Sequence, residues 1–254
     1  MPSEVGELVD HYLGTADRLA PGLVDGLHLT GSVALGDYHP GTSDIDFLAA
    51  VPSIDVALLA SVHAEMPTSP NFDGIYLTPA QLAARPDDEP VVPHVVNGVF
   101  HTDKHCGELN PVLWLTLARY GVTVRGPSLR GLQVDEDRLR QWNLNNLTSY
   151  WQPLADQIRA VCADRRPDAP AAAVGVVWAA LGPARLHYTL ATGDVTSKGG
   201  AALYITERFP AWADLAARVV AWRAGEPVEF TTSDALAAAD LVDAVTTDAA
   251  ELGD

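Results

Sequence analysis

The chain has 254 residues, 48% of them hydrophobic, and its 33 acidic and 16 basic residues give a net charge of −17. This length accommodates one large domain or two ordinary domains with a sizeable core. The acidic charge argues against nucleic acid as the main partner, because phosphate backbones attract basic surfaces. It favours a polycationic small molecule, although an acidic surface can equally serve solubility alone.

Cysteine usage and the first residues of the chain bear on its compartment. Cys106 and Cys162 are the two cysteines, and neither belongs to a Cys-x-x-Cys or zinc-binding spacing. This is typical of a reduced, cytoplasmic protein without disulfides. The first ten residues lack the basic and apolar regions of a signal peptide, and no uncharged apolar run reaches the ~18 residues of a membrane span. We therefore expect a cytoplasmic protein with no membrane partner.

The first half of the chain alternates between helical and strand patterns. Apolar residues at helical spacing, with Asn-Pro and Thr-Pro pairs as starts, predict helices over 4–19, 54–66, 79–84 and 111–120. Alternating or β-rich runs predict strands over 23–30, 44–51, 73–78 and 122–125. In 91–102 the β-rich run is interrupted by Pro93 and Gly98, which indicates either an edge strand or a hairpin.

The character of the sequence changes after Gly126-Pro127. Strand patterns disappear, and helical patterns cover 135–163, 171–192, 199–208, 210–223 and 232–250. We therefore predict an α+β protein with two domains. The first, residues 1–133, combines a mixed sheet with helices, and the second, residues 134–254, is all-helical.

Two acidic residues at the start of a strand dominate the first domain. Asp44 and Asp46 lie two apart, so both side chains point to the same face of the strand. Two such carboxylates repel each other unless a cation binds between them, and oxygen ligands suit Mg²⁺, which completes its shell with water and substrate phosphates. Upstream, Gly31 and Ser32 follow the first strand, where backbone N–H groups and a hydroxyl can hold a phosphate. A lone Asp-x-Asp is also common on solvated strand ends.

The spacing of these residues resembles a known signature. Gly-Ser, a glycine-rich spacer and then Ser-Asp-x-Asp is the pattern of the nucleotidyltransferase superfamily that includes DNA polymerase β. Three later segments, at 110–127, 184–198 (ARLHYTLATGDVTSK) and 207–210 (ERFP), resemble the streptomycin/spectinomycin adenylyltransferases of that superfamily. The resemblance covers nearly the whole chain. It implies Mg²⁺-dependent transfer of AMP from ATP to a hydroxyl of an aminoglycoside or aminocyclitol, with release of pyrophosphate.

The resemblance also implies roles for individual residues. Asp44 and Asp46 match the metal ligands, and Asp73, on the next sheet strand, is the candidate for the catalytic base and a further metal ligand. Two ions about 4 Å apart, bridged by such carboxylates, would stabilise the attacking and leaving oxygens. The residues matched to ATP binding are Gly31, Ser32, Ser43, Arg185, Lys198 and Trp222, the last standing where the family packs a Tyr on the nucleotide.

Departures from the family pattern affect the acceptor rather than the nucleotide. Gly175 stands where the family has its streptomycin-binding acid, and the family's aminoglycoside-contacting Trp falls near Phe100 or His101. An adenylyltransferase with another small-molecule or protein acceptor therefore remains an alternative, as does a non-catalytic nucleotide-binding protein. The partners we expect are ATP and a small-molecule acceptor, bound by a monomer or weak dimer.

Two further site assignments also stay open. Glu108 is an alternative to Asp73 as the base. The run from His101 through Asp103 and His105 to Cys106 has the residue types of a zinc site, although it lacks a second ligand pair.

Overall fold

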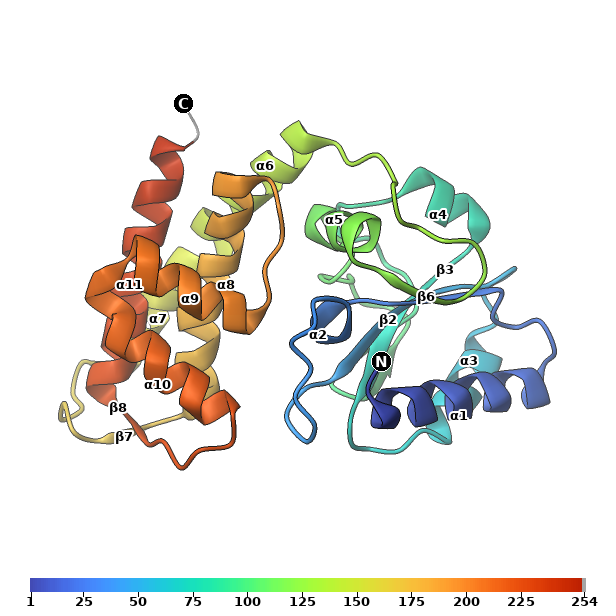
Figure 1. Cartoon of the computed structure of the whole chain (residues 1–254), viewed down its shortest axis with the longest axis horizontal. Coiled ribbons are helices and arrows are strands. Elements are labelled where there is room, and N and C mark those ends of the chain that lie inside the picture. The colour runs from blue at the N-terminus through green and yellow to red at the C-terminus, as the bar shows by residue number, and fades with distance from the viewer. Residues whose placement is uncertain (253–254) are drawn as a thin grey trace. The chain divides into compact units, whose positions relative to one another are not determined.

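The computed structural model describes residues 1–252, and the chain divides into two compact units, Met1–Val134 and Asp135–Asp254 (Figure 1). The N-terminal unit contains helices and strands in alternation. Its helices are α1 (Ser3–Leu19), α2 (Gly31–Ala34), α3 (Val56–Ala64), α4 (Pro79–Ala84) and α5 (Pro111–Arg119). Its strands are β1 (Gly26–Leu29), β2 (Ile45–Ala50), β3 (Phe72–Leu77), β4 (His94–Val96), β5 (Val99–His101) and β6 (Val122–Arg125).

These strands form a mixed sheet, as predicted. Their order is β5-β4-β3-β2-β1-β6, in which β2 and β3 are parallel and the other neighbouring pairs are antiparallel. The parallel pairing places Asp46 directly opposite Asp73. Two of the predicted acidic residues therefore lie side by side on neighbouring strands.

Side-chain alternation along β2 fixes the register of this pair. Ile45 and Phe47 are buried in a core shared with α1 and α3, whereas Leu48 is buried on the opposite face with residues of α5. Figure 1 shows α1 and α3 on one face of the sheet and α5 on the other. A slip of one residue would drive the acidic side chains into the first core, so burial of the apolar residues sets where the acids point.

The segment 91–102 forms a hairpin rather than a single edge strand. Asn97 and Gly98 join β4 to β5 with positive φ angles of 52° and 70°. Positive φ at both turn residues is the geometry that an Asn-Gly pair favours, because its twist matches that of the flanking strands.

The C-terminal unit is a bundle of helices. They are α6 (Glu136–Asn146), η1 (Leu147–Trp151), α7 (Gln152–Cys162), α8 (Ala173–Thr192), α9 (Lys198–Arg208), η2 (Pro210–Trp212), α10 (Ala213–Arg223) and α11 (Thr232–Glu251). Helix α8 packs against α6, α9, α10 and α11. Its small buried residues, Ala179, Ala180 and Ala184 among them, contribute to one continuous apolar core.

Two features of this unit differ from the predicted pattern. The helix predicted over 135–163 contains a π-helical turn, η1, which ends two residues before Pro153. Proline has no N–H for the regular backbone bond, and the wider turn accommodates its absence. A short antiparallel pair, β7 (Pro170–Ala171) with β8 (Phe230–Thr231), also accompanies the helices. Within the described residues, no helix is long and apolar enough to cross a membrane.

Candidate functional site

The carboxylate of Asp46 lies against the backbone of Gly31. Gly31 has a φ of +55°, and a Cβ atom added there would lie 1.8 Å from Asp46 Oδ2 and 2.7 Å from Asp46 Cγ. The backbone joins the same two segments, because the N–H of Thr30 donates to the carbonyl of Asp46 at 2.9 Å. Glycine is therefore required at position 31 on two grounds, its backbone conformation and the closeness of the acid.

The loop between α2 and β2 is closed by its own hydrogen bonds. The N–H of His39 donates to Ser43 Oγ at 3.1 Å, and the N–H of Ser43 donates to the carbonyl of His39 at 2.9 Å. At a longer 3.5 Å, Ser32 Oγ donates to the carbonyl of Asp44. The predicted residues Gly31, Ser32, Ser43, Asp44 and Asp46 thus gather in this one loop and its two ends. The structure adds a role for Ser43, whose hydroxyl holds the loop together.

Asp44 is exposed at the end of this loop, and Asp46 is partly buried. A small open pocket of about 90 Å³ lies beside Asp44, lined by residues 41–44 and 68–71. Tyr38, in the same loop, donates to Glu4 Oε2 at 2.8 Å. Burial raises the pKa of Tyr38 to about 12, with further contributions from Glu4 and from the negative charge of Asp44. Tyr38 therefore stays protonated and fixes the loop to α1.

Asp73 is held by the hairpin turn. Its Oδ2 accepts from the N–H of Asn97 at 2.6 Å, and its Oδ1 accepts from the N–H of Gly98 at 2.9 Å. Burial raises the pKa of this carboxyl, the two N–H groups oppose the rise, and the charge of Asp44 adds to it. Asp73 is therefore electrostatically linked to Asp44, but both of its oxygens are engaged by backbone donors.

The arrangement supplies two acids rather than three for a metal ion. Among residues 1–252, no group of three or more His, Cys, Asp or Glu side chains is gathered closely enough to hold a metal. Asp44 and Asp46 nevertheless have the oxygen donors that Mg²⁺ takes, and this ion needs few carboxylates because water and phosphate complete its shell. The zinc alternative is likewise without support among these residues. In that segment Cys106 is buried, and His105 Nδ1 lies 2.7 Å from the carbonyl oxygen of Glu89.

The C-terminal unit brings the two predicted basic residues to one helix end. Lys198 is the first residue of α9, which Ser197 caps by accepting from the N–H of Gly200 at 3.0 Å. From α8, Arg185 Nε donates to the carbonyl of Thr196 at 3.3 Å, two residues before Lys198. Arg185 and Lys198 therefore both lie near the first turn of α9.

The remaining predicted residues take separate positions. Trp222 lies in the last turn of α10 and packs, partly buried, against the helical core. Gly175 is exposed near the start of α8, and a Cβ added there meets nothing within 4 Å. Glu108, the alternative base, is exposed in the loop before α5.

Backbone groups that take part in these contacts were not predicted. The N–H groups of Asn97 and Gly98 could have been anticipated as a turn, since Asn-Gly between two β-rich runs is a strong hairpin signal. The carbonyl of Thr196 carries no such signal, because any residue supplies one.

Comparisons with known proteins bear on residues 13–61 and on the fold of the chain. The family model "Nucleotidyltransferase domain" matches residues 13–61, which include β1, α2 and β2. A search of the curated proteins finds no match. Among solved structures, the chain resembles the spectinomycin adenyltransferase AAD(9) from Enterococcus faecialis, solved with ATP and spectinomycin. The TM-score is 0.69 at 13% identity, over 95% of this chain and 99% of that chain.

The likeness in fold covers both units. Residues 13–61 of the N-terminal unit match the nucleotidyltransferase domain, and the whole chain has an α+β fold similar to that of the adenyltransferase structure. The domain match over residues 13–61 supports an enzyme of the nucleotidyltransferase type.

Proposed function

We propose that the protein transfers AMP from ATP to a hydroxyl group of an aminoglycoside or aminocyclitol, with Mg²⁺ as cofactor and pyrophosphate as the second product. The observation that carries this proposal is the seating of the Asp46 carboxylate against Gly31, within residues 13–61 that match the nucleotidyltransferase domain. It joins the glycine of the Gly-Ser pair and the second acid of Asp-x-Asp into one local structure.

In the proposed reaction, the acceptor oxygen attacks the α-phosphorus and the bond to pyrophosphate breaks. Asp44 and Asp46 would hold Mg²⁺, which supplies charge stabilisation for the attacking and leaving oxygens. Asp73 takes the hydroxyl proton, and the raised pKa of its carboxyl suits a general base. To do so, one carboxylate oxygen must exchange a backbone N–H of the hairpin turn for the acceptor hydroxyl.

Nucleotide contacts are assigned to polar and basic residues within each unit. Ser32 and Gly31 follow β1 and are assigned to a phosphate. Arg185 and Lys198 are assigned to the triphosphate, where they neutralise the charge that builds on departing pyrophosphate. Trp222 is assigned to the nucleotide base.

The proposed acceptor is a cationic small molecule. The structural neighbour was solved with spectinomycin, and the net charge of −17 favours a cationic acceptor. Gly175 replaces the acid that the resemblance associates with streptomycin, which favours spectinomycin-like aminocyclitols. The same glycine supports a second candidate function, adenylyl transfer to a different small molecule or to a protein side chain. A reaction that consumes ATP agrees with the cytoplasmic location expected from the cysteines.

Pyrophosphate release tests the proposal directly. The purified protein is incubated with ATP, Mg²⁺ and, one at a time, spectinomycin, streptomycin and other aminoglycosides. We expect acceptor-dependent release that EDTA stops and excess Mg²⁺ restores. Release without any of these acceptors would favour the second candidate function. Titration calorimetry with ATP and Mg²⁺ tests the nucleotide assignment by itself. Absence of ATP binding would refute both candidate functions.

A further inference from the structure

A chain of polar contacts joins three helices of the C-terminal unit. On α8, the fully buried His187 places Nδ1 2.8 Å from Tyr204 Oη of α9 and Nε2 2.7 Å from Asp248 Oδ2 of α11. Arg208, the last residue of α9, donates from Nη2 to both oxygens of Asp248, at 2.7 and 2.9 Å. The contacts therefore run from α8 to α9 directly and again through α11.

The protonation of these groups permits a single arrangement of donors. Burial alone would raise the pKa of Asp248, but hydrogen bonds from Arg208 and His187 outweigh it and hold this pKa below its usual value. The resulting carboxylate can only accept, so Nε2 of His187 carries the proton that it donates. Burial lowers the pKa of His187, and the neutral ring accepts at Nδ1 from the hydroxyl of Tyr204. In each hydrogen bond, one group can only donate and the other can only accept, so the bonds define a single geometry.

This network holds the helix that begins with Lys198. Tyr204 and Arg208 lie in the middle and at the end of α9, whereas Arg185 binds the carbonyl of Thr196 just before its start. His187 is two residues beyond Arg185 on α8. Because α9 is one straight segment of roughly 16 Å, fixing its C-terminal half sets the position of Lys198 relative to Arg185.

We propose that His187, Tyr204, Arg208 and Asp248 are positioning residues that fix α9, and with it Lys198, for binding the triphosphate of ATP. This inference rests on the nucleotide part of the proposed function. Buried polar groups of this kind do not exceed well-packed apolar side chains in stability, so packing alone does not call for them. Their directional hydrogen bonds fix the position of α9, and therefore of its first residue, Lys198.

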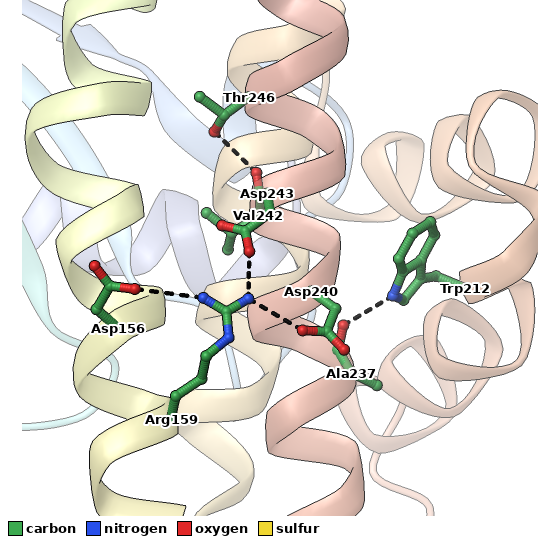
Figure 2. Close-up of polar contacts among 8 residues, drawn as sticks. All are labelled: Asp156, Arg159, Trp212, Ala237, Asp240, Val242, Asp243 and Thr246. Atoms are coloured by element: carbon green, nitrogen blue, oxygen red, sulfur yellow. Dashed lines mark hydrogen bonds and ion pairs between the residues drawn. The ribbon is translucent and has the colours of Figure 1, made fainter.

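A second network in the same unit provides a matched control. Arg159 of α7 is paired with Asp156 of its own helix and with Asp240 and Asp243 of α11 (Figure 2). It resembles the Arg208 pairing in charge and in its link to α11, but it involves no residue of α9. Arg208 and Arg159 are both partly exposed, at 49% and 32%, so neither replacement by glutamine leaves a buried cavity.

The test compares Arg208→Gln, His187→Phe and the control Arg159→Gln. Titration calorimetry measures the Kd of ATP with Mg²⁺, and thermal unfolding measures stability. We expect Arg208→Gln to weaken ATP binding about fivefold or more, the usual size of coupling between linked sites, and Arg159→Gln to bind as the wild type does. His187→Phe keeps the ring packing and, where folded, should weaken ATP binding whether or not its melting temperature falls.

Two different failures can be told apart. A wild-type protein that does not bind ATP would refute the proposed function and, with it, this inference. A wild type that binds ATP while Arg208→Gln binds equally well would refute the positioning role alone. Because Arg208 lies at the surface, that variant decides the question even where His187→Phe does not fold.

Discussion

A methyl group at Gly31 would occupy space that the Asp46 carboxylate fills. The added Cβ would lie 1.8 Å from Asp46 Oδ2, whereas ordinary contact begins near 3.4 Å, so the oxygen must retreat by the difference, about 1.6 Å. The φ of +55° adds a backbone cost of roughly 1–2 kcal/mol for any residue with a Cβ. Gly31→Ala therefore displaces a proposed metal ligand while leaving its chemical identity unchanged.

The expected loss of activity follows from the size of that displacement. Misplacing a reacting group by about 1 Å can cost on the order of 100-fold in rate, so we expect at least that loss in kcat/KM. Gly36→Ala is the matched control. It has a φ of +69° with nothing within 4 Å of the added Cβ, so it incurs the backbone cost without touching an acid.

Both variants are assayed by pyrophosphate release with the best acceptor and by thermal unfolding. We expect similar, modest losses of melting temperature, with the large loss of turnover confined to Gly31→Ala. Turnover in Gly31→Ala within about threefold of that in Gly36→Ala, where misplacement predicts far more, would show that the position of Asp46 does not matter to the reaction. The roles assigned to Asp44 and Asp46 would then be wrong.

Three further outcomes are expected. Asp44→Asn and Asp46→Asn each abolish transfer with an unchanged circular dichroism spectrum, and turnover in either variant would refute the metal assignment. Asp73→Asn removes most of kcat and also abolishes the decrease of kcat at acidic pH. If kcat of the variant still decreased at acidic pH as in the wild type, Asp73 would not be the base. Burial lowers the pKa of His63 from 6.5 to about 4, so the unfolded state binds the extra proton and stability falls as pH drops between these values. The free energy of unfolding, measured by urea unfolding, falls by about 3 kcal/mol over this range. If a His63→Gln variant lost stability equally steeply with pH, His63 would not be the cause.

Much of the N-terminal unit follows from local patterns. Asp44 precedes β2 and Asp46 is its second residue. The residue between them, Ile45, is fully buried, and alternation alone predicts a common face for the two acids. The helix after Asn110 begins where Asn-Pro predicts it, since the Asn110 side chain accepts from the N–H groups of Val112 and Leu113. These features depend on neighbours within a few residues.

The features that were not predicted depend either on residues far apart in the sequence or on a choice between neighbouring residues that can each cap a helix. The bonds from Asn97 and Gly98 to Asp73 span 24 and 25 residues and exist only because β4 pairs with β3. Helix α3 begins after Asp55, which caps it by accepting from the N–H of Leu58, rather than at residue 54. The pairing of β7 with β8 joins residues about 60 apart, each in a run too short to give a strand pattern.

The open surface at Gly175 has an evolutionary consequence. Any glycine codon ending in U or C becomes an aspartate codon by one base change, and one ending in A or G can become a glutamate codon in the same way. Since a Cβ at this position meets nothing within 4 Å, no compensating change in the core has to come first. If the family's acid-bearing position does select streptomycin, a single mutation on α8 could extend the range of acceptors while the carboxylates of the N-terminal unit stay as they are.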